Sequence, residues 1–280
     1  MLADDSTHPF RHQTAEDALI GLGSRRETER DHRFWRADCP GPALVPPPPR
    51  KWYLFLKSVL EYGMALVLLT LSSPVIFLAA LLVKLTSAGP VFYHQVRLGK
   101  NGRHFRLYKI RTKVHNCEKV SGPRWAVPND PRITPVGRCL RRTHLDELPQ
   151  LWNVLRGEMA LVGPRPERPE FVPALEKAIP HYRDRLLIRP GLTGLAQVQL
   201  PADTDLGSVR RKLAYDLYYI CHLGPWLDLR LLLCTGVHVL GVPYPILTRL
   251  FRMPRREVVE NHYRHRHTTS RVASDQTCRS

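Results

Sequence analysis

The chain has 280 residues, of which 43% are apolar, enough to form a folded core and to exclude a wholly disordered protein. Its formal net charge of +17 predicts an anionic partner: nucleic acid, a phospholipid surface or a phosphorylated substrate. The six cysteines are scattered without a CxxC pair, which favours free thiols in a reducing compartment over a disulfide framework.

The first 50 residues are polar and nearly balanced in charge, and they end in the proline run 46–49. This composition predicts a flexible extension rather than a domain. The stretch contains no apolar core of a secretory signal, so none is expected.

The sequence then turns apolar from Val59 to Leu85, with no charge between Glu61 and Lys84. As a straight helix this stretch rises about 40 Å, more than the roughly 30 Å of a bilayer's hydrocarbon core. Ser73-Pro74 near its middle predicts a kink or break. Basic residues flank both ends, so the positive-inside rule gives no orientation. From these residues alone, a spanning helix and a helix that returns to the same face remain open for the membrane segment 51–88.

Residues 89–241 form the expected catalytic domain. Its last part, 223–241, is apolar but carries Asp228, which favours an interfacial or core helix over a second span. Residues 242–280 are expected to be a basic tail. Its histidines lack a carboxylate or cysteine pattern, so a solvated or headgroup-binding tail is favoured over a metal site.

Thirteen lysines and arginines fall between positions 97 and 142, opposed by only two acidic residues. A solvated face resting on anionic lipid is one interpretation. However, the cations alternate with strand-forming apolar residues over 105–111, and the block runs directly into an acidic pair. Lys109 and Arg111 are therefore candidate substrate contacts.

That acidic pair is Asp146-Glu147, which precedes Pro149, a residue suited to the first turn of a helix. Backbone N–H groups at such a helix start favour carboxylate and phosphate alike. The neighbouring Arg141 favours an ionised aspartate and is a candidate phosphate ligand. An ionised carboxylate beside a phosphoryl group is a candidate nucleophile, and a second one helps to bind a divalent cation.

Two further loops each hold one arginine within a rigid Pro/Gly turn. They are Gly163-Pro164-Arg165-Pro166 and Arg189-Pro190-Gly191-Leu192-Thr193-Gly194. Rigidity limits the entropy lost when a cation is ordered against an anionic ligand, so Arg165 and Arg189 are also candidates.

Together these segments resemble the bacterial sugar transferases, also called monotopic phosphoglycosyl transferases or undecaprenyl-phosphate sugar phosphotransferases. The resemblance runs from about 57 to 241 and is carried by residues 91–112, 130–171, 188–198 and 213–220. It implies a small α+β catalytic domain on the membrane, with a re-entrant N-terminal helix hairpin broken at Ser73-Pro74 and amphipathic interfacial helices. The implied location is the cytoplasmic face of the bacterial inner membrane.

The implied reaction transfers a sugar 1-phosphate from a UDP-sugar to undecaprenyl phosphate, releases UMP and uses Mg²⁺. It starts an exopolysaccharide, capsule or O-antigen chain. Asp146 falls on the family's nucleophile, which forms a covalent phosphosugar intermediate, and is also the expected metal ligand; Glu147 completes the dyad. Arg141 falls on a phosphate-binding arginine, and Pro164-Arg165-Pro166 on the loop associated with uridine.

Two departures from the family pattern are His144 in place of the usual serine and Lys113 in place of a common methionine. The competing interpretation is a membrane-tethered basic module that binds anionic lipid or nucleic acid, which leaves the dyad and both loops unexplained. A catalytically dead scaffold is disfavoured by the intact dyad. Nucleic acid is therefore not expected as a partner, a homodimer is a candidate assembly, and no motif identifies the sugar.

Overall fold

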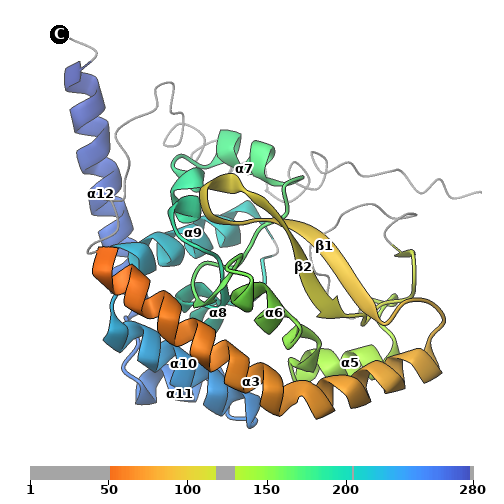
Figure 1. The fold of residues 1–280 in the computed structure, drawn as a ribbon. Helices are drawn as coiled ribbons and strands as arrows, with labels where there is room; N and C mark the ends of the chain where they lie inside the picture. Colours follow the sequence, from red (N-terminus) through yellow and green to blue (C-terminus); the bar gives the residue numbers. More distant parts are fainter. Residues whose placement is uncertain (1–50, 118–129, 204, 278–280) are drawn as a thin grey trace, which may run out of the picture.

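The computed structural model describes residues 51–117, 130–203 and 205–277, and the extension expected for residues 1–50 lies outside them. The helices are α3 (Lys51–Thr86), α5 (Pro135–Arg142), α6 (Gln150–Leu155), α7 (Val172–Ala178), α8 (Leu195–Gln199), α9 (Leu206–Cys221), α10 (Pro225–Val239), α11 (Tyr244–Leu250) and α12 (Arg256–Thr277). The strands are β1 (Phe92–Leu98), β2 (His104–Ile110), β3 (Ala160–Val162) and β4 (Gly191–Thr193). In Figure 1, α3 runs along the lower side of the molecule near α10 and α11, with the β1–β2 hairpin above it. The presence of both helices and strands confirms the predicted mixed helix-and-strand domain.

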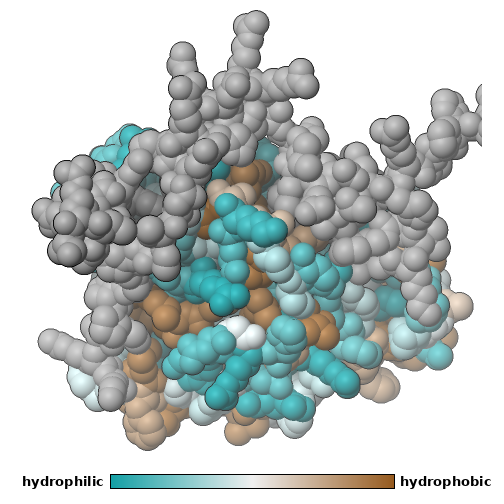
Figure 2. Space-filling view, turned by 90° about the horizontal axis from the view of Figure 1, so that it is seen from above, coloured by the Kyte–Doolittle hydropathy of each residue, from teal (hydrophilic) through white to brown (hydrophobic). Residues whose placement is uncertain are grey.

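Helix α3 has an apolar outer face. Phe55, Leu71, Phe77 and Leu85 are each more than 70% exposed. Among the described residues, α3 is the one helix long and apolar enough to cross a membrane. By contrast, hydrophilic side chains gather over the middle of the face seen from above in Figure 2. A large exposed apolar surface is typical of a site that contacts a membrane or another protein.

Pro74 lies inside α3, and the helix bends past its middle (Figure 1). Proline has no N–H to donate to the carbonyl four residues back, which belongs to Thr70. The Ser73 hydroxyl donates to that carbonyl instead, at 2.8 Å. The segment is thus one bent helix, continuous from Lys51 to Thr86, rather than two separate helices.

The first half of α3 is joined to the domain by a buried polar network. The Lys57 ammonium pairs with Glu61 at 2.8 Å and with Asp228 of α10 at 2.6 Å. Glu61 also accepts the backbone N–H groups of Leu161 and Val162, both at 3.1 Å. Because these charges are buried and paired, the helix is fixed to the domain here.

The second half of α3 is joined to the domain by apolar contacts. Ala79 and Val83 are buried in a small cluster with Ile110 of β2 and Leu140 of α5. Both halves of the helix therefore lie against the same folded body.

Strands β1 and β2 pair antiparallel, from Phe92 opposite Ile110 to Leu98 opposite His104. The turn between them contains Asn101 in the left-handed region, with φ 56°. Phe105 and Leu107 are buried and alternate with the exposed His104 and Arg106. This period of two explains why the segment forms a strand with one face on the core.

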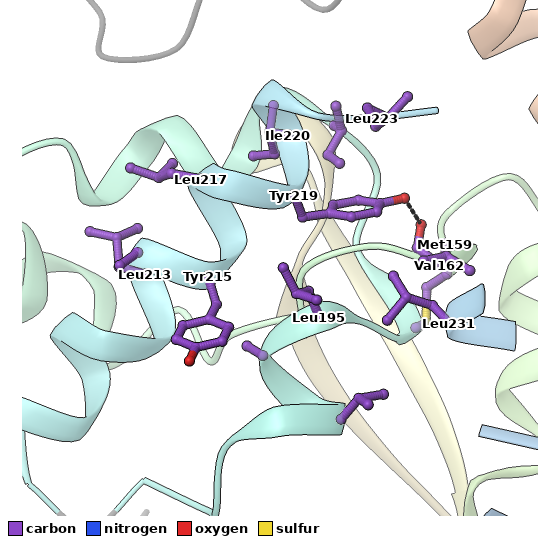
Figure 3. Close-up of a cluster of buried hydrophobic side chains, with 14 of the residues drawn as sticks. Met159, Val162, Leu195, Leu213, Tyr215, Leu217, Tyr219, Ile220, Leu223 and Leu231 are labelled. Carbon is purple, nitrogen blue, oxygen red and sulfur yellow. Dashed lines mark hydrogen bonds between the residues drawn. The ribbon is translucent and has the colours of Figure 1, made fainter. Parts of the chain in front are cut away.

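The main core surrounds β3, whose three residues are all buried. β3 pairs in parallel with β4, joining Ala160 to Gly191 and Val162 to Thr193. The Tyr219 hydroxyl of α9 donates to the Val162 carbonyl at 3.2 Å, among buried leucines from α8, α9 and α10 (Figure 3). The two loops singled out in the sequence both adjoin this parallel pair.

Helix α10 has one side buried in the core and one side exposed at the surface. It buries Leu231 and Cys234, while Trp226, Leu229 and Leu233 remain exposed. The buried side confirms a core helix over 223–241, and an interfacial role for its exposed side stays a prediction. Exposed apolar residues continue on α11.

The segment after residue 241, expected to be a basic tail, packs in part against the domain core. Leu247 of α11, Met253, and Val259 and Tyr263 of α12 are buried in the main core. Val259 and Tyr263 are four residues apart and share one helix face, which packs on α9. Up to Tyr263 the segment is thus part of the domain rather than a solvated tail, because these apolar residues cover the core.

Candidate active site

The dyad lies in a short 3₁₀ turn, Leu145–Glu147, directly before α6. His144 precedes it in the left-handed region, with φ 57° and ψ 13°, and reverses the chain after α5. Leu145 packs against the small apolar cluster under the second half of α3. The dyad is thus held between α5, α6 and α3.

Glu147 is held by two cations. Its carboxylate accepts Lys109 Nζ at 2.6 Å and Arg165 Nη2 at 2.6 Å. Lys109 extends the buried face of β2 beyond Phe105 and Leu107, and Arg165 comes from the loop after β3. Although burial favours the neutral form, the Arg165 guanidinium and the Lys109 ammonium hold the pKa of Glu147 well below its usual value. Glu147 is therefore ionised and has little freedom to move.

Asp146 has the opposite environment. Its side chain is only 6% exposed, and within the described part of the chain its carboxylate accepts no hydrogen bond. Burial raises the pKa of Asp146 to about 6, against the opposing attraction of Lys109. Two adjacent carboxyls whose pKa values are shifted in opposite directions are typical of a site that assigns them different roles. Glu147 is the fixed one, and Asp146 keeps its oxygens available.

Arg141 is positioned by a close approach of α5. Gly137 lies so close to the Thr112 carbonyl that a Cβ atom would come within 2.1 Å of it. This contact lets Arg141 Nε donate to the Thr112 hydroxyl at 2.8 Å. Arg141 also lies close enough to Asp146 to favour its charged form. The sequence prediction that groups Arg141 with the dyad agrees with this placement.

The two arginine loops lie side by side. Gly163 N–H donates to the Thr193 carbonyl at 2.9 Å, and Gly191 N–H donates to the Pro164 carbonyl at 2.8 Å. A Cβ atom on Gly191 would meet the Gly163 nitrogen at 2.1 Å, so glycine is required at this crossing. The contact fixes the start of the loop that carries Arg165 to Glu147.

Residues that sequence reasoning missed support the same loop. Arg185 Nη2 donates to the Arg165 carbonyl at 2.9 Å and pairs with the buried Asp216 at 2.8 Å. Arg97 Nη1 donates to the Pro166 carbonyl at 3.0 Å. These contacts join positions 20 to 69 residues apart, so no local motif marks them.

Arg111 and Arg189 lie elsewhere. Arg111 donates to the carbonyls of Ser87 and Ala88, just beyond the end of α3. Arg189 donates to Tyr62 and Ser58 in the first half of α3. No described contact joins either arginine to the dyad, and their substrate roles remain predictions.

The two departures from the family pattern have different surroundings. Lys113 pairs with Asp130 at 2.9 Å. The His144 ring meets the His238 ring edge-on with 5.5 Å between centroids, and His238 stacks on Tyr244 at 3.6 Å. Burial also lowers the pKa of His144, which favours its neutral form. Only His144 adjoins the dyad, because it directly precedes the turn that carries it. His238 of α10 and Tyr244 of α11 form a ring stack beside it.

No group of three histidine, cysteine or acidic side chains that could hold a metal occurs within the described residues. Mg²⁺ usually binds one or two carboxylates together with substrate phosphates rather than a protein cage. The unshared oxygens of Asp146 fit that mode, whereas those of Glu147 are already bonded to cations.

Residues 52–241 match the protein family described as "Bacterial sugar transferase". Over 186 residues the chain is 41% identical to the UDP-N-acetylgalactosamine-undecaprenyl-phosphate N-acetylgalactosaminephosphotransferase of Aeromonas hydrophila, covering 66% of this chain and 43% of that protein. Over 192 residues it is 40% identical to the UDP-glucose:undecaprenyl-phosphate glucose-1-phosphate transferase of Xanthomonas campestris pv. campestris, covering 68% and 40%.

The exopolysaccharide production protein PSS of Rhizobium leguminosarum bv. phaseoli is 41% identical over 189 residues, covering 66% of this chain and 94% of that protein. The chain thus spans about two fifths of the length of the first two relatives and nearly all of the third. The match includes nearly all of α3, the dyad and both arginine loops, so the chain belongs to the bacterial sugar transferase family.

Proposed function

We propose that this chain transfers a sugar 1-phosphate from a UDP-sugar to undecaprenyl phosphate, releasing UMP, as the initiating step of polysaccharide synthesis. The observation that carries the proposal is the unlike pair at the dyad: a desolvated Asp146 beside a Glu147 fixed by Lys109 and Arg165. The names of the two relatives describe the same class of transfer.

In the first half-reaction, an Asp146 carboxylate oxygen attacks the sugar-linked phosphorus of the donor. The bond from that phosphorus to the UMP oxygen breaks, and UMP leaves with its electron pair. In the second, a phosphate oxygen of the polyprenyl phosphate attacks the same phosphorus, and the aspartyl bond breaks to restore the carboxylate. A carboxylate stripped of water and of hydrogen-bond donors is a stronger nucleophile than a solvated one.

Lys109, Arg165 and Arg141 surround the dyad with positive charge. Fixed cations aimed at a transferring phosphoryl group stabilise the charge that develops on its oxygens. Glu147 is already bonded to two of these cations, so its role here is to hold Lys109 and Arg165 in place. Asp146 would be the protein ligand of Mg²⁺, and the ion would supply further neutralisation of phosphate charge.

We place the protein on the cytoplasmic face of the inner membrane as a monotopic protein, with α3 entering and leaving by the same side. Two observations support this topology. Both halves of α3 lie against one folded body, and the Ser73 hydroxyl bonds the carbonyl that Pro74 leaves free. An unsatisfied carbonyl in hydrocarbon costs several kcal/mol, so this bond lets the helix bend within lipid.

The topology can be tested with native cysteines. Cys39 precedes α3 in the sequence, and Cys139 is exposed on α5. Variants that keep only one of these two thiols should be labelled from the same side in intact cells. Labelling from opposite sides contradicts the monotopic arrangement.

The activity is tested by mass spectrometry of the purified protein with a panel of UDP-sugars and no acceptor. The expected result is one equivalent of UMP and a phosphosugar adduct on wild type, and neither on Asp146→Asn. Glu257→Gln, an exposed acidic residue on α12, is the matched control and should behave as wild type. Adduct formation by Asp146→Asn contradicts the assignment, and no UMP from any sugar, with or without undecaprenyl phosphate, favours a basic binding module.

A further inference from the structure

A hollow of about 250 Å³ lies beside the first half of α3, distinct from the dyad. Its polar lining includes Ser58, Lys100 and Arg189, and its apolar lining includes Phe55, Ile188 and Leu223. These residues come from α3, the β1–β2 turn, the segment before β4 and the turn before α10. The hollow therefore has cationic and apolar walls.

Arg189 lacks the carboxylate partner that several other cations near the core have. Arg165, Arg185 and Lys57 each pair with at least one carboxylate. Arg189 instead donates to two hydroxyls, those of Tyr62 and Ser58, and no carboxylate lies within ion-pairing distance of it among the described residues. Its guanidinium also lies over the Tyr62 ring, 5.6 Å from the centroid.

This arrangement leaves donor capacity unused. A guanidinium carries five N–H donors, and the described contacts of Arg189 use two. A half-buried cation without a counter-ion is unfavourable unless an anion or water completes its bonds. Lys100 adds a second positive charge from the exposed turn. Guanidinium groups suit phosphate because two parallel N–H bonds match two phosphate oxygens.

The apolar wall indicates what kind of phosphate fits. Phe55 is 73% exposed and lies on the outer face of α3, the face with the largest apolar surface. A free phosphate ion gains nothing from that wall, whereas a lipid places its phosphate at Arg189 and its chains along α3.

We infer that the hollow at Arg189 binds the phosphate headgroup of a membrane phospholipid. The guanidinium of Arg189 and the ammonium of Lys100 contact the phosphate, and Phe55 contacts the acyl chain. The site fixes the first half of α3 at the level of the headgroups. It needs no transfer reaction, so its test is independent of the proposed function.

The test measures binding to the purified full-length chain in a neutral detergent by isothermal titration. Three probes are compared: dihexanoyl phosphatidylglycerol, inorganic phosphate and the uncharged dihexanoylglycerol. Wild type is expected to bind the phospholipid at least tenfold more tightly than either other probe. Arg189→Gln should weaken phospholipid binding at least tenfold, and Lys100→Gln at least threefold. Arg249→Gln, an exposed arginine on α11, is the matched control and should bind as wild type.

Three outcomes overturn the inference. If inorganic phosphate binds as tightly as the phospholipid, the acyl chains contribute nothing and the ligand is not a lipid. If dihexanoylglycerol binds as tightly as the phospholipid, the phosphate contributes nothing. If Arg189→Gln binds the phospholipid with unchanged affinity, the phospholipid does not bind at Arg189. If Arg189→Gln does not fold, Lys100→Gln decides, because Lys100 lies in an exposed turn outside the core.

Discussion

Replacing the proposed nucleophile should make the protein more stable while it abolishes turnover. Burial raises the pKa of Asp146 from 3.8 to about 6. Between these values the folded chain binds a proton that the unfolded chain releases, so stability is lost as the pH rises through this window. The full difference corresponds to about 3 kcal/mol. Asp146→Asn removes the charge and keeps the shape, so the variant should recover this free energy.

The gain depends on pH in a way that identifies its cause. The two pKa values predict a gain of about 3 kcal/mol at pH 8, about 1.5 at pH 5 and about 0.5 at pH 4. Thermal and denaturant unfolding of wild type and Asp146→Asn across this range measure it. Glu147→Gln is the contrasting variant, since it leaves Lys109 and Arg165 without their carboxylate and should destabilise the fold by about 3–5 kcal/mol. A variant Asp146→Asn that is no more stable than wild type at pH 8, or whose gain is the same at pH 4, refutes the reasoning.

Three further outcomes are expected. UMP release should fall about tenfold per pH unit below about 6, because Asp146 must be ionised to attack, and a flat profile down to pH 4.5 contradicts this. Arg165→Ala should lower kcat on the order of 100-fold with the membrane-bound fraction unchanged, as measured by UMP release from sedimented membranes. His144→Val should destabilise the fold by about 1–2 kcal/mol in thermal unfolding, because a β-branched residue is strained at φ 57°, whereas His144→Asn should cost less; equal losses contradict the backbone argument.

The sequence predicted the features whose signals are local. The membrane segment was expected at 51–88, and a single long helix spans Lys51–Thr86, because a long uncharged apolar run favours a helix. The strand over 105–111 followed from its alternation, and the dyad was expected just before a helix. Each of these rests on residues within one turn or strand of one another.

The parts that escaped prediction depend on distant contacts. The sequence around Arg189 predicts a rigid turn but does not say whether the side chain faces the dyad or α3. Its partner Tyr62 lies 127 residues away. β3 and β4 have three residues each, too few for alternation to show. The spacing of Val259 and Tyr263 was a local signal for a buried face, but it was hidden among the many charges of the C-terminal segment.

The ion pairs of α3 also constrain the order of events during synthesis. Asp228 lies 171 residues after Lys57, so at about 5–20 residues per second it is made roughly 10–30 s after its partner. During that interval Lys57 and Glu61, which are four residues apart, can neutralise only each other. Leu161 and Val162, whose N–H groups bond Glu61, are synthesised next, and Asp228 last. The charge network of α3 therefore cannot be complete until the ribosome has made α10.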